Sequence, residues 1–233
     1  MNRFLFVVLL ATSPLETTDP LHPTAHSLDR WQAAHVQALK KQGSPEYEIR
    51  NVAFFAGDVD PTDEGIGTDS AVVTERTTSG DACTIGMREL TLSWKKEDDQ
   101  AVVEKERLMG ADCCDLDHCE KRTAGGWMSH LVQVCAVSEG QEQRLVKLVD
   151  PKRGIGVAIT TNSGPRPRKV RWKRADADSL CNLEIAKFDC EEKTPDGARF
   201  TCTTAFLHEH YYFVWRRKNG ATYIERISGT LED

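Results

Sequence analysis

The segment that decides the fold reads Tyr211-Tyr-Phe-Val-Trp-Arg-Arg217, then Asn219-Gly220, then Thr222-Tyr-Ile-Glu-Arg-Ile227. Two runs rich in β-branched and aromatic residues flank an Asn-Gly pair, and both residues of that pair tolerate the positive φ of a two-residue hairpin turn. The segment therefore predicts an antiparallel hairpin. Its aromatic side chains are expected to pack in the core and across strands, with an aromatic ligand cradle as the alternative.

The same pattern recurs along most of the chain. Short runs of β-branched and aromatic residues, bounded by glycine, proline or charged turns, predict further strands at 47–55, 71–77, 83–94, 101–108, 127–137, 144–149, 155–161, 169–173, 183–188 and 200–207. Short direct connections favour antiparallel pairing. A twisted sheet of this size usually closes on itself or splits. We expect an α+β fold, predominantly antiparallel β, forming a sandwich or a curved, partly open barrel.

One N-terminal helix is predicted before the strands begin. Ser27 suits the N-cap, Lys40-Lys41 lie in the last turn and Gly43 follows as the stop. The apolar residues between these signals fall near one helical face: Leu28, Trp31, Ala34, Val36 and Leu39.

Composition limits the class of protein. The 233 residues are 39% hydrophobic and 28% charged, which excludes wholesale disorder and is enough for one sizeable core. The net charge of −6 argues against bulk nucleic-acid binding. Neither an internal repeat nor a linker divides the chain, so residues 27–233 are expected to form one disulfide-stabilised domain.

The N-terminus resembles an export signal. Arg3 precedes eight apolar residues, Phe4 to Ala11, and residues 1–13 are therefore predicted to be a secretory signal peptide whose cleavage site stays open. Residues 14–26 are interpreted as a leader into the fold. Beyond residue 13 no apolar run approaches the roughly 20 residues of a membrane-spanning helix. We expect a secreted or periplasmic protein.

The cysteines agree with export. The chain has eight, an even number, and an even set in an exported chain predicts disulfides. Adjacent Cys113 and Cys114 are expected to reach different partners, because a bridge between neighbours strains the intervening peptide. The predicted disulfide cysteines are Cys83, Cys113, Cys114, Cys119, Cys135, Cys181, Cys190 and Cys202.

A His-x-His pair suggests a metal site. His208 and His210 would share one face of a strand, so both imidazoles could bind one Zn²⁺, with His118, His130 or a carboxylate as third ligand. Ordinary polar turn residues are the alternative.

Two acidic segments are weaker metal candidates. Residues 58–69 space their carboxylates as in a calcium loop, but Asp63 and Asp69 replace the glycine and the bidentate glutamate of an EF-hand. Residues 112–120 could bind a soft metal through thiolates if reduced. In an oxidising compartment a disulfide-pinned surface loop is the favoured interpretation. No cofactor is predicted outright; Zn²⁺ and Ca²⁺ are the alternatives.

A basic run is the candidate anion-binding site. Six basic residues in nine could engage a polyanion or an anionic surface. As a strand, the segment would place its alternate basic side chains outward and Val170 and Trp172 inward, which an ordinary exposed strand also does. The predicted anion-binding residues are Arg166, Arg168, Lys169, Arg171, Lys173 and Arg174.

No catalytic residue is predicted. The sequence contains no phosphate loop, dinucleotide loop, nucleophile elbow or His-Glu-x-x-His motif. The favoured function is an exported, non-catalytic binding or surface-interaction domain that engages an anionic partner through the basic strand. The alternatives are a carrier of hydrophobic cargo in a curved-sheet cavity and a metal-dependent hydrolase using the His-x-His pair.

Overall fold

The computed structural model describes residues 46–55, 66–79, 82–95, 101–119, 122–161, 168–206 and 209–231. The chain divides into two compact units, Met1–Cys83 with Arg88–Arg107, and Thr84–Met87 with Leu108–Asp233. Mostly antiparallel strands with few helices build both, as the sequence predicts. The expected single domain and the sandwich or barrel closure stay predictions.

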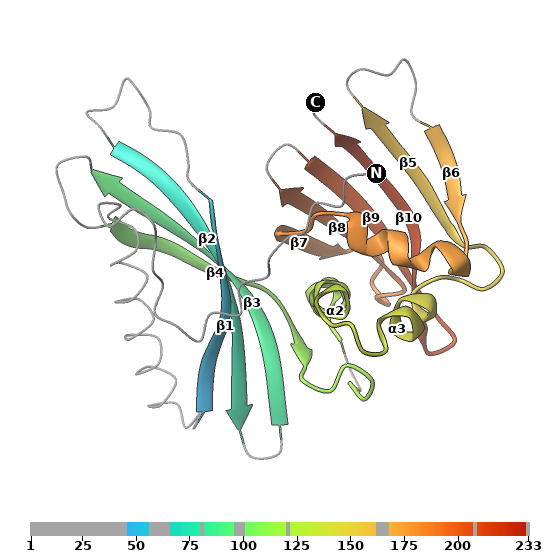
Figure 1. Cartoon of the computed structure of the whole chain (residues 1–233), viewed down its shortest axis with the longest axis horizontal. Helices are drawn as coiled ribbons and strands as arrows, with labels where there is room; N and C mark the ends of the chain where they lie inside the picture. The colour runs from blue at the N-terminus through green and yellow to red at the C-terminus, as the bar shows by residue number, and fades with distance from the viewer. Residues whose placement is uncertain are drawn as a thin grey trace. The chain divides into compact units, whose positions relative to one another are not determined.

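Four long strands form the sheet of the first unit. Its strands are neighbours in chain order: β1 (Glu46–Phe55), β2 (Ile66–Ser79), β3 (Ala82–Lys95) and β4 (Ala101–Cys113) (Figure 1). β1 runs antiparallel to β2, with Phe55 opposite Ser70 and Glu46 opposite Thr78. This hairpin-by-hairpin order follows from short connections.

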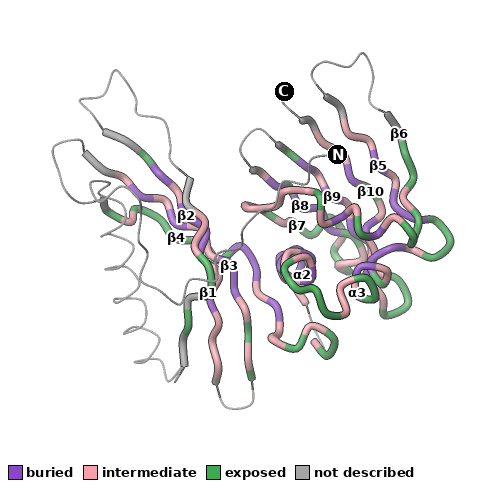
Figure 2. The backbone as a smooth tube through the Cα atoms, viewed as in Figure 1, coloured by how far each residue is buried: buried purple, intermediate pink, exposed green. Residues whose placement is uncertain are grey.

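The core of the first unit uses alternate strand residues. Leu90 and Leu92 are buried, whereas Thr91 between them is half-buried, because successive side chains of a strand point to opposite faces. Ala71 and Val73 of β2 complete the buried cluster. Figure 2 shows this buried band along the middle of the strands.

The second unit holds a six-stranded sheet with the order β6-β5-β10-β9-β8-β7. Its strands are β5 (Ile155–Thr161), β6 (Arg168–Trp172), β7 (Lys187–Glu192), β8 (Arg199–Phe206), β9 (Glu209–Lys218) and β10 (Ala221–Leu231). The β9–β10 hairpin predicted at Asn219-Gly220 is confirmed, and both turn residues have positive φ, 52° and 75°. β5 pairs parallel with β10, so the expectation of direct antiparallel connections fails for this pair.

Burial along the hairpin explains the register. Tyr211, Phe213 and Trp215 alternate with less buried neighbours on β9, so the aromatic residues lie in the core as predicted. On β10, Ile224 and Ile227 are both buried although they are three positions apart, an odd spacing for one face of a strand. The register shift between Ile224 and Arg226 accounts for this, because a bulge resets the alternation.

The described helices lie in the middle of the chain: α2 (Ala124–Ala136), α3 (Gln141–Lys147) and the 3₁₀ helix η1 (Arg174–Asn182). The helix predicted between Ser27 and Gly43 lies outside the described residues. The strands predicted at 127–137 and 144–149 are wrong, because these segments form α2 and α3. Figure 1 shows the helices over one face of the six-stranded sheet. In the described part of the chain, no helix has the length and apolarity to cross a membrane.

Helix α2 forms because its start and its spacing both favour a helix. Thr123 is the N-cap and its hydroxyl accepts a hydrogen bond from the Gly126 N–H at 3.1 Å. Met128, Leu131 and Val134, three residues apart, are fully buried on one helical face. This face packs toward β7 and β8. The period of three outweighs the strand propensity of the valines.

Candidate functional site

The second unit contains a pocket of about 320 Å³. Its walls come from the loop after β4, from α2, α3 and η1, and from the turn and first residues of β10. Four basic side chains line it: Arg122, Arg144, Lys147 and Arg174. Asp117, His130, Trp127 and Tyr223 also contribute to the lining. The volume suits a small ligand.

A buried carboxylate organises one wall of the pocket. Asp112, at the end of β4, is 2% exposed. Its Oδ1 accepts hydrogen bonds from Arg122 Nε at 2.6 Å and from the Cys113 N–H at 2.8 Å. Its Oδ2 lies 2.9 Å from Nδ1 of His130. A buried carboxylate with three donors is well satisfied, so Asp112 holds both pocket side chains in place.

Arg122 and Trp127 form a second contact in this wall. The Arg122 guanidinium carbon lies 4.9 Å from the centroid of the Trp127 ring. Arg122 also donates from Nη2 to the Leu116 carbonyl at 2.9 Å. Together with the Asp112 contact, these interactions fix the guanidinium at the pocket wall.

Asp117 holds the two cations of α3. Its Oδ2 accepts from Arg144 Nη2 at 2.7 Å and its Oδ1 lies 3.4 Å from Lys147 Nζ. The hydrogen bond from Arg144 and, to a smaller extent, that from Lys147 lower the pKa of Asp117 to about 2, against the opposing effect of burial. Arg144 and Lys147 are three residues apart and so share one helical face.

Arg174 is the least constrained cation of the pocket. It is the first residue of η1 and its side chain is exposed. Among the described residues we find no hydrogen bond or ion pair for its guanidinium. The four cations face two carboxylates: Asp117 in the lining and the buried Asp112 behind the wall. The local charge of the pocket is therefore positive, although the chain has a net charge of −6. Such a concave positive site attracts anions.

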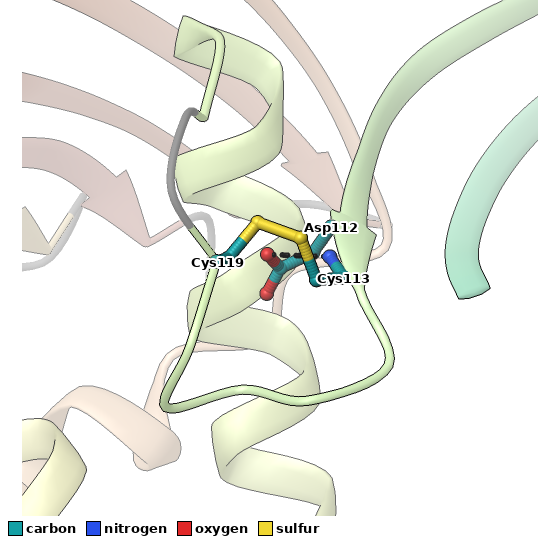
Figure 3. A group of neighbouring side chains, drawn as sticks. All are labelled: Asp112, Cys113 and Cys119. Carbon is teal, nitrogen blue, oxygen red and sulfur yellow. Dashed lines mark hydrogen bonds between the residues drawn. A yellow bond between two sulfur atoms is a disulfide. The ribbon is translucent and has the colours of Figure 1, made fainter. Parts of the chain in front are cut away.

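A disulfide closes the loop that supplies Asp117. Cys113 and Cys119 are bonded, and Figure 3 shows Asp112 beside them. Inside the loop, Asp115 accepts hydrogen bonds from the N–H groups of Asp117 and His118. Asp112, Cys113 and Cys119 lie close enough to share a metal ion. The sulfurs are consumed in the disulfide and Asp112 is engaged by three donors, so this donor set does not fit a thiolate-bound metal.

The disulfide prediction is confirmed for all eight cysteines. Besides Cys113–Cys119, the bridges include Cys135–Cys181 and Cys190–Cys202. The expectation that Cys113 does not bond to its neighbour also holds. The Cys135–Cys181 bridge joins α2 to η1, two elements that line the pocket.

The predicted anion-binding residues do not stay together. Arg166 and the side chains of Arg168 and Lys169 lie outside what the structure describes. Arg171 is exposed on β6, the edge strand of the sheet, and donates to the Arg153 carbonyl at 2.5 Å. Lys173 is an exposed N-cap of η1. Of those that the structure describes, only Arg174 lines the pocket.

The expected inward orientation on this strand is wrong in one position. Val170 is 44% exposed, whereas Trp172 is half-buried. β6 is an edge strand, and basic side chains on an edge also discourage pairing with other chains. The strand therefore has a structural reason for its charge.

Among the described residues, the structure brings no further ligand to the predicted metal sites. His208 lies outside the described residues, and His210 is exposed on β9. His118 is exposed and contacts Asp115 at 2.9 Å, and His130 contacts Asp112. Within the described ranges, the group of possible metal ligands does not include His210. The calcium candidate at 58–69 falls largely outside the described residues. Both sites stay predictions.

Sequence reasoning missed Arg122, Arg144 and Lys147, and gave His130 only as a metal ligand. Arg144 and Lys147 would have been linked by their i, i+3 spacing had the segment been predicted as helical. Arg122 and His130 have no such signal, because Asp112 brings them together through tertiary contacts. No family model, curated protein or solved structure matches the chain.

Proposed function

We propose that the chain is an exported, non-catalytic binding domain that holds a small anionic ligand in the cationic pocket of its second unit. The single observation that carries the proposal is the convergence of Arg122, Arg144, Lys147 and Arg174 from three segments onto one concavity. Arginine and lysine side chains are donors only, and suit carboxylate or phosphate groups.

The disulfides support the export part of the proposal. All eight cysteines are oxidised, which is typical of the extracellular space or the periplasm. Intact mass of the secreted protein tests it. We expect a chain without residues 1–13 whose cysteines are alkylated only after reduction. A retained N-terminus or free thiols without reduction would contradict export.

Titration calorimetry with inorganic phosphate at low salt tests the pocket. We expect Arg174→Gln to weaken phosphate binding at least tenfold, because one charge-assisted hydrogen bond is worth about 1.5–3 kcal/mol. Lys147→Gln should have a similar effect. The matched control is Lys152→Gln, which removes an exposed lysine outside the pocket lining. Equal affinities in all four proteins would refute the pocket as the site.

The basic strand gives a second candidate, a polyanion site. Arg171 is exposed on the edge strand β6, and Lys173 and Arg174, exposed in the residues that follow it, continue the basic run along which an extended polyanion could lie. Replacing Arg168, Lys169, Arg171 and Lys173 by Ser should then abolish salt-sensitive retention on heparin. Wild-type protein that passes through a heparin column unretained at low salt would exclude this candidate.

The two other functions stay alternatives. A hydrophobic carrier is not supported by this pocket, since its walls carry four cations, and organic extraction for bound lipid tests it. A hydrolase centred on His208 and His210 requires a stoichiometric metal that is lost in His210→Ala.

A further inference from the structure

His130 differs from the other charged or titratable residues of the pocket. It is 5% exposed, whereas the pocket residues Asp117, Lys147 and Arg174 are exposed. Its Nδ1 lies 2.9 Å from Asp112 Oδ2, and the Asp112 side chain is fully buried. A carboxylate can only accept, so Nδ1 is the ring nitrogen that donates. Nε2 is then the atom left for a ligand.

The His130 ring is held in one orientation, so its two nitrogens do not easily exchange places by a ring flip. Trp127 packs edge-on to it, with the ring centroids 5.6 Å apart and an interplanar angle of 83°. Asp112 is itself fixed by Arg122 and by the Cys113 N–H. With the proton held on Nδ1, Nε2 of the neutral ring is a hydrogen-bond acceptor.

A side-chain atom that can only accept is unusual in this lining, because the hydroxyls of Thr222 and Tyr223 can also donate. The four cations can only donate. Asp117 also accepts, but its two oxygens are each engaged, one by Arg144 and the other by Lys147. An oxyanion without a proton would set a lone pair against Nε2. An oxyanion with its own O–H group would donate a hydrogen bond there while its charge meets the cations.

We infer that the ligand is a small oxyanion that carries a hydroxyl proton, such as hydrogen phosphate or a hydroxycarboxylate. His130, positioned by Asp112, selects it through Nε2. This inference rests on the proposed anion-binding function and adds the chemical class of the ligand to it.

Matched pairs of anions test the inference by titration calorimetry at neutral pH. Phosphate and sulfate have the same shape but only phosphate keeps a proton, and glycolate differs from acetate by one hydroxyl. We expect the hydroxylated member of at least one pair to bind about tenfold more tightly, because an unmade buried hydrogen bond is costly. Selectivity in the first pair only identifies phosphate, and selectivity in the second only identifies a hydroxycarboxylate.

His130→Asn separates selection from attraction. The shorter amide can still donate to Asp112 but has no atom at the position of Nε2. We expect it to bind both members of the selective pair with similar affinity, because binding of the hydroxylated anion weakens and that of the unhydroxylated anion does not. The matched control is His118→Asn, an exposed histidine on the pocket loop, which should keep the selectivity.

The outcomes are distinguishable. Equal binding of both members in both pairs by the wild-type protein would overturn this inference and leave the proposed anion binding intact. No binding of any anion would overturn both. Selectivity that survives in His130→Asn would overturn the role of His130. If thermal melting shows that His130→Asn is not folded, the ratio of the wild-type affinities within each pair of anions still decides the class of ligand.

Discussion

Close backbone contact at single residues shapes the pocket wall. Gly125 in the first turn of α2 faces the end of β4, and a Cβ at this position would lie 2.3 Å from the Met109 carbonyl oxygen. A Cβ on Gly110 would meet the Gly125 carbonyl oxygen at 2.2 Å. Both glycines are therefore needed for the approach that places Asp112 beside His130.

Gly125→Ala should destabilise the protein. Alanine gains about 1 kcal/mol of helix propensity, but the clash with a backbone oxygen costs about 1–3 kcal/mol or more. We expect the net loss to appear in chemical denaturation. The control is Gly156→Ala, whose Cβ would find only the Glu225 carbonyl oxygen at 3.7 Å. A more stable Gly125→Ala variant would contradict the contact.

The depressed pKa of Asp117 depends on Arg144. NMR titration of the carboxyl carbons should give Asp117 a pKa of about 2, and Arg144→Gln should raise it toward the ordinary value of 3.8. Because the folded-state pKa is depressed, the contribution of Asp117 to stability is present above pH 3.8 and is lost as the pH falls through about 2. The Lys152→Gln protein should keep the depressed pKa; a value near 3.8 in the wild type would refute the pairing.

Asp150, in the turn before β5, shows the same balance between burial, which raises the pKa of a carboxyl group, and nearby donors, which lower it. Burial alone would raise its pKa, but hydrogen bonds from the N–H groups of Arg153 and Lys152, and the charge of Arg216, lower it instead. Arg216 Nη2 lies 2.7 Å from Asp150 Oδ2. The turn at residues 150–154 is thereby tied to β9, and its Gly154 has the positive φ of 64°.

Among the elements, α2 contributes most to the site. It supplies Trp127 and His130 to the pocket while Met128, Leu131 and Val134 are buried. Helical periodicity places these two sets on adjoining faces, so the packing of α2 and the position of His130 depend on each other.

Thr123→Ala should therefore weaken both stability and binding. Loss of the hydroxyl that accepts from the Gly126 N–H removes the N-cap, which costs about 1 kcal/mol. Thermal denaturation measures the loss. Thr123→Ser keeps the capping oxygen and should behave as the wild type, and equal stability of the Ala and Ser variants would show that the cap does not matter.

At the scale of the whole molecule, disulfides stabilise the elements around the pocket. Cys135 of α2 and Cys181 of η1 are bonded across 46 residues of sequence. Bridges that close longer loops restrict the unfolded chain more. This bridge also connects the helix that bears His130 to the one that bears Arg174.

Replacing Cys135 and Cys181 together by alanine should lower the free energy of unfolding by about 3–4 kcal/mol. The comparison is the Cys190→Ala, Cys202→Ala double variant, whose bridge spans 12 residues and should cost less. Denaturation with urea measures both. A larger loss in the second variant would contradict the loop-length argument. Phosphate binding should weaken more in the first variant, because η1 is released.

The sequence alone determined the features that depend on residues close together in the chain or on composition. Alternation and turn residues predicted β5 with its observed bounds and the β9–β10 hairpin. The even cysteine number predicted complete oxidation. These features are local, or follow from composition, and so can be recognised without knowing the fold.

Only the tertiary structure decided how the segments combine. The identity of α2 as a helix depends on burial of one face against the sheet, which outweighs the strand propensity of its valines. The pocket also depends on the tertiary structure, because its residues come from separate segments of the chain: Asp112, Arg122, His130, Arg144 and Arg174. Charge in the sequence drew attention to the basic run, yet of its described residues only Arg174 lines the pocket, since long-range packing brings it beside the other cations.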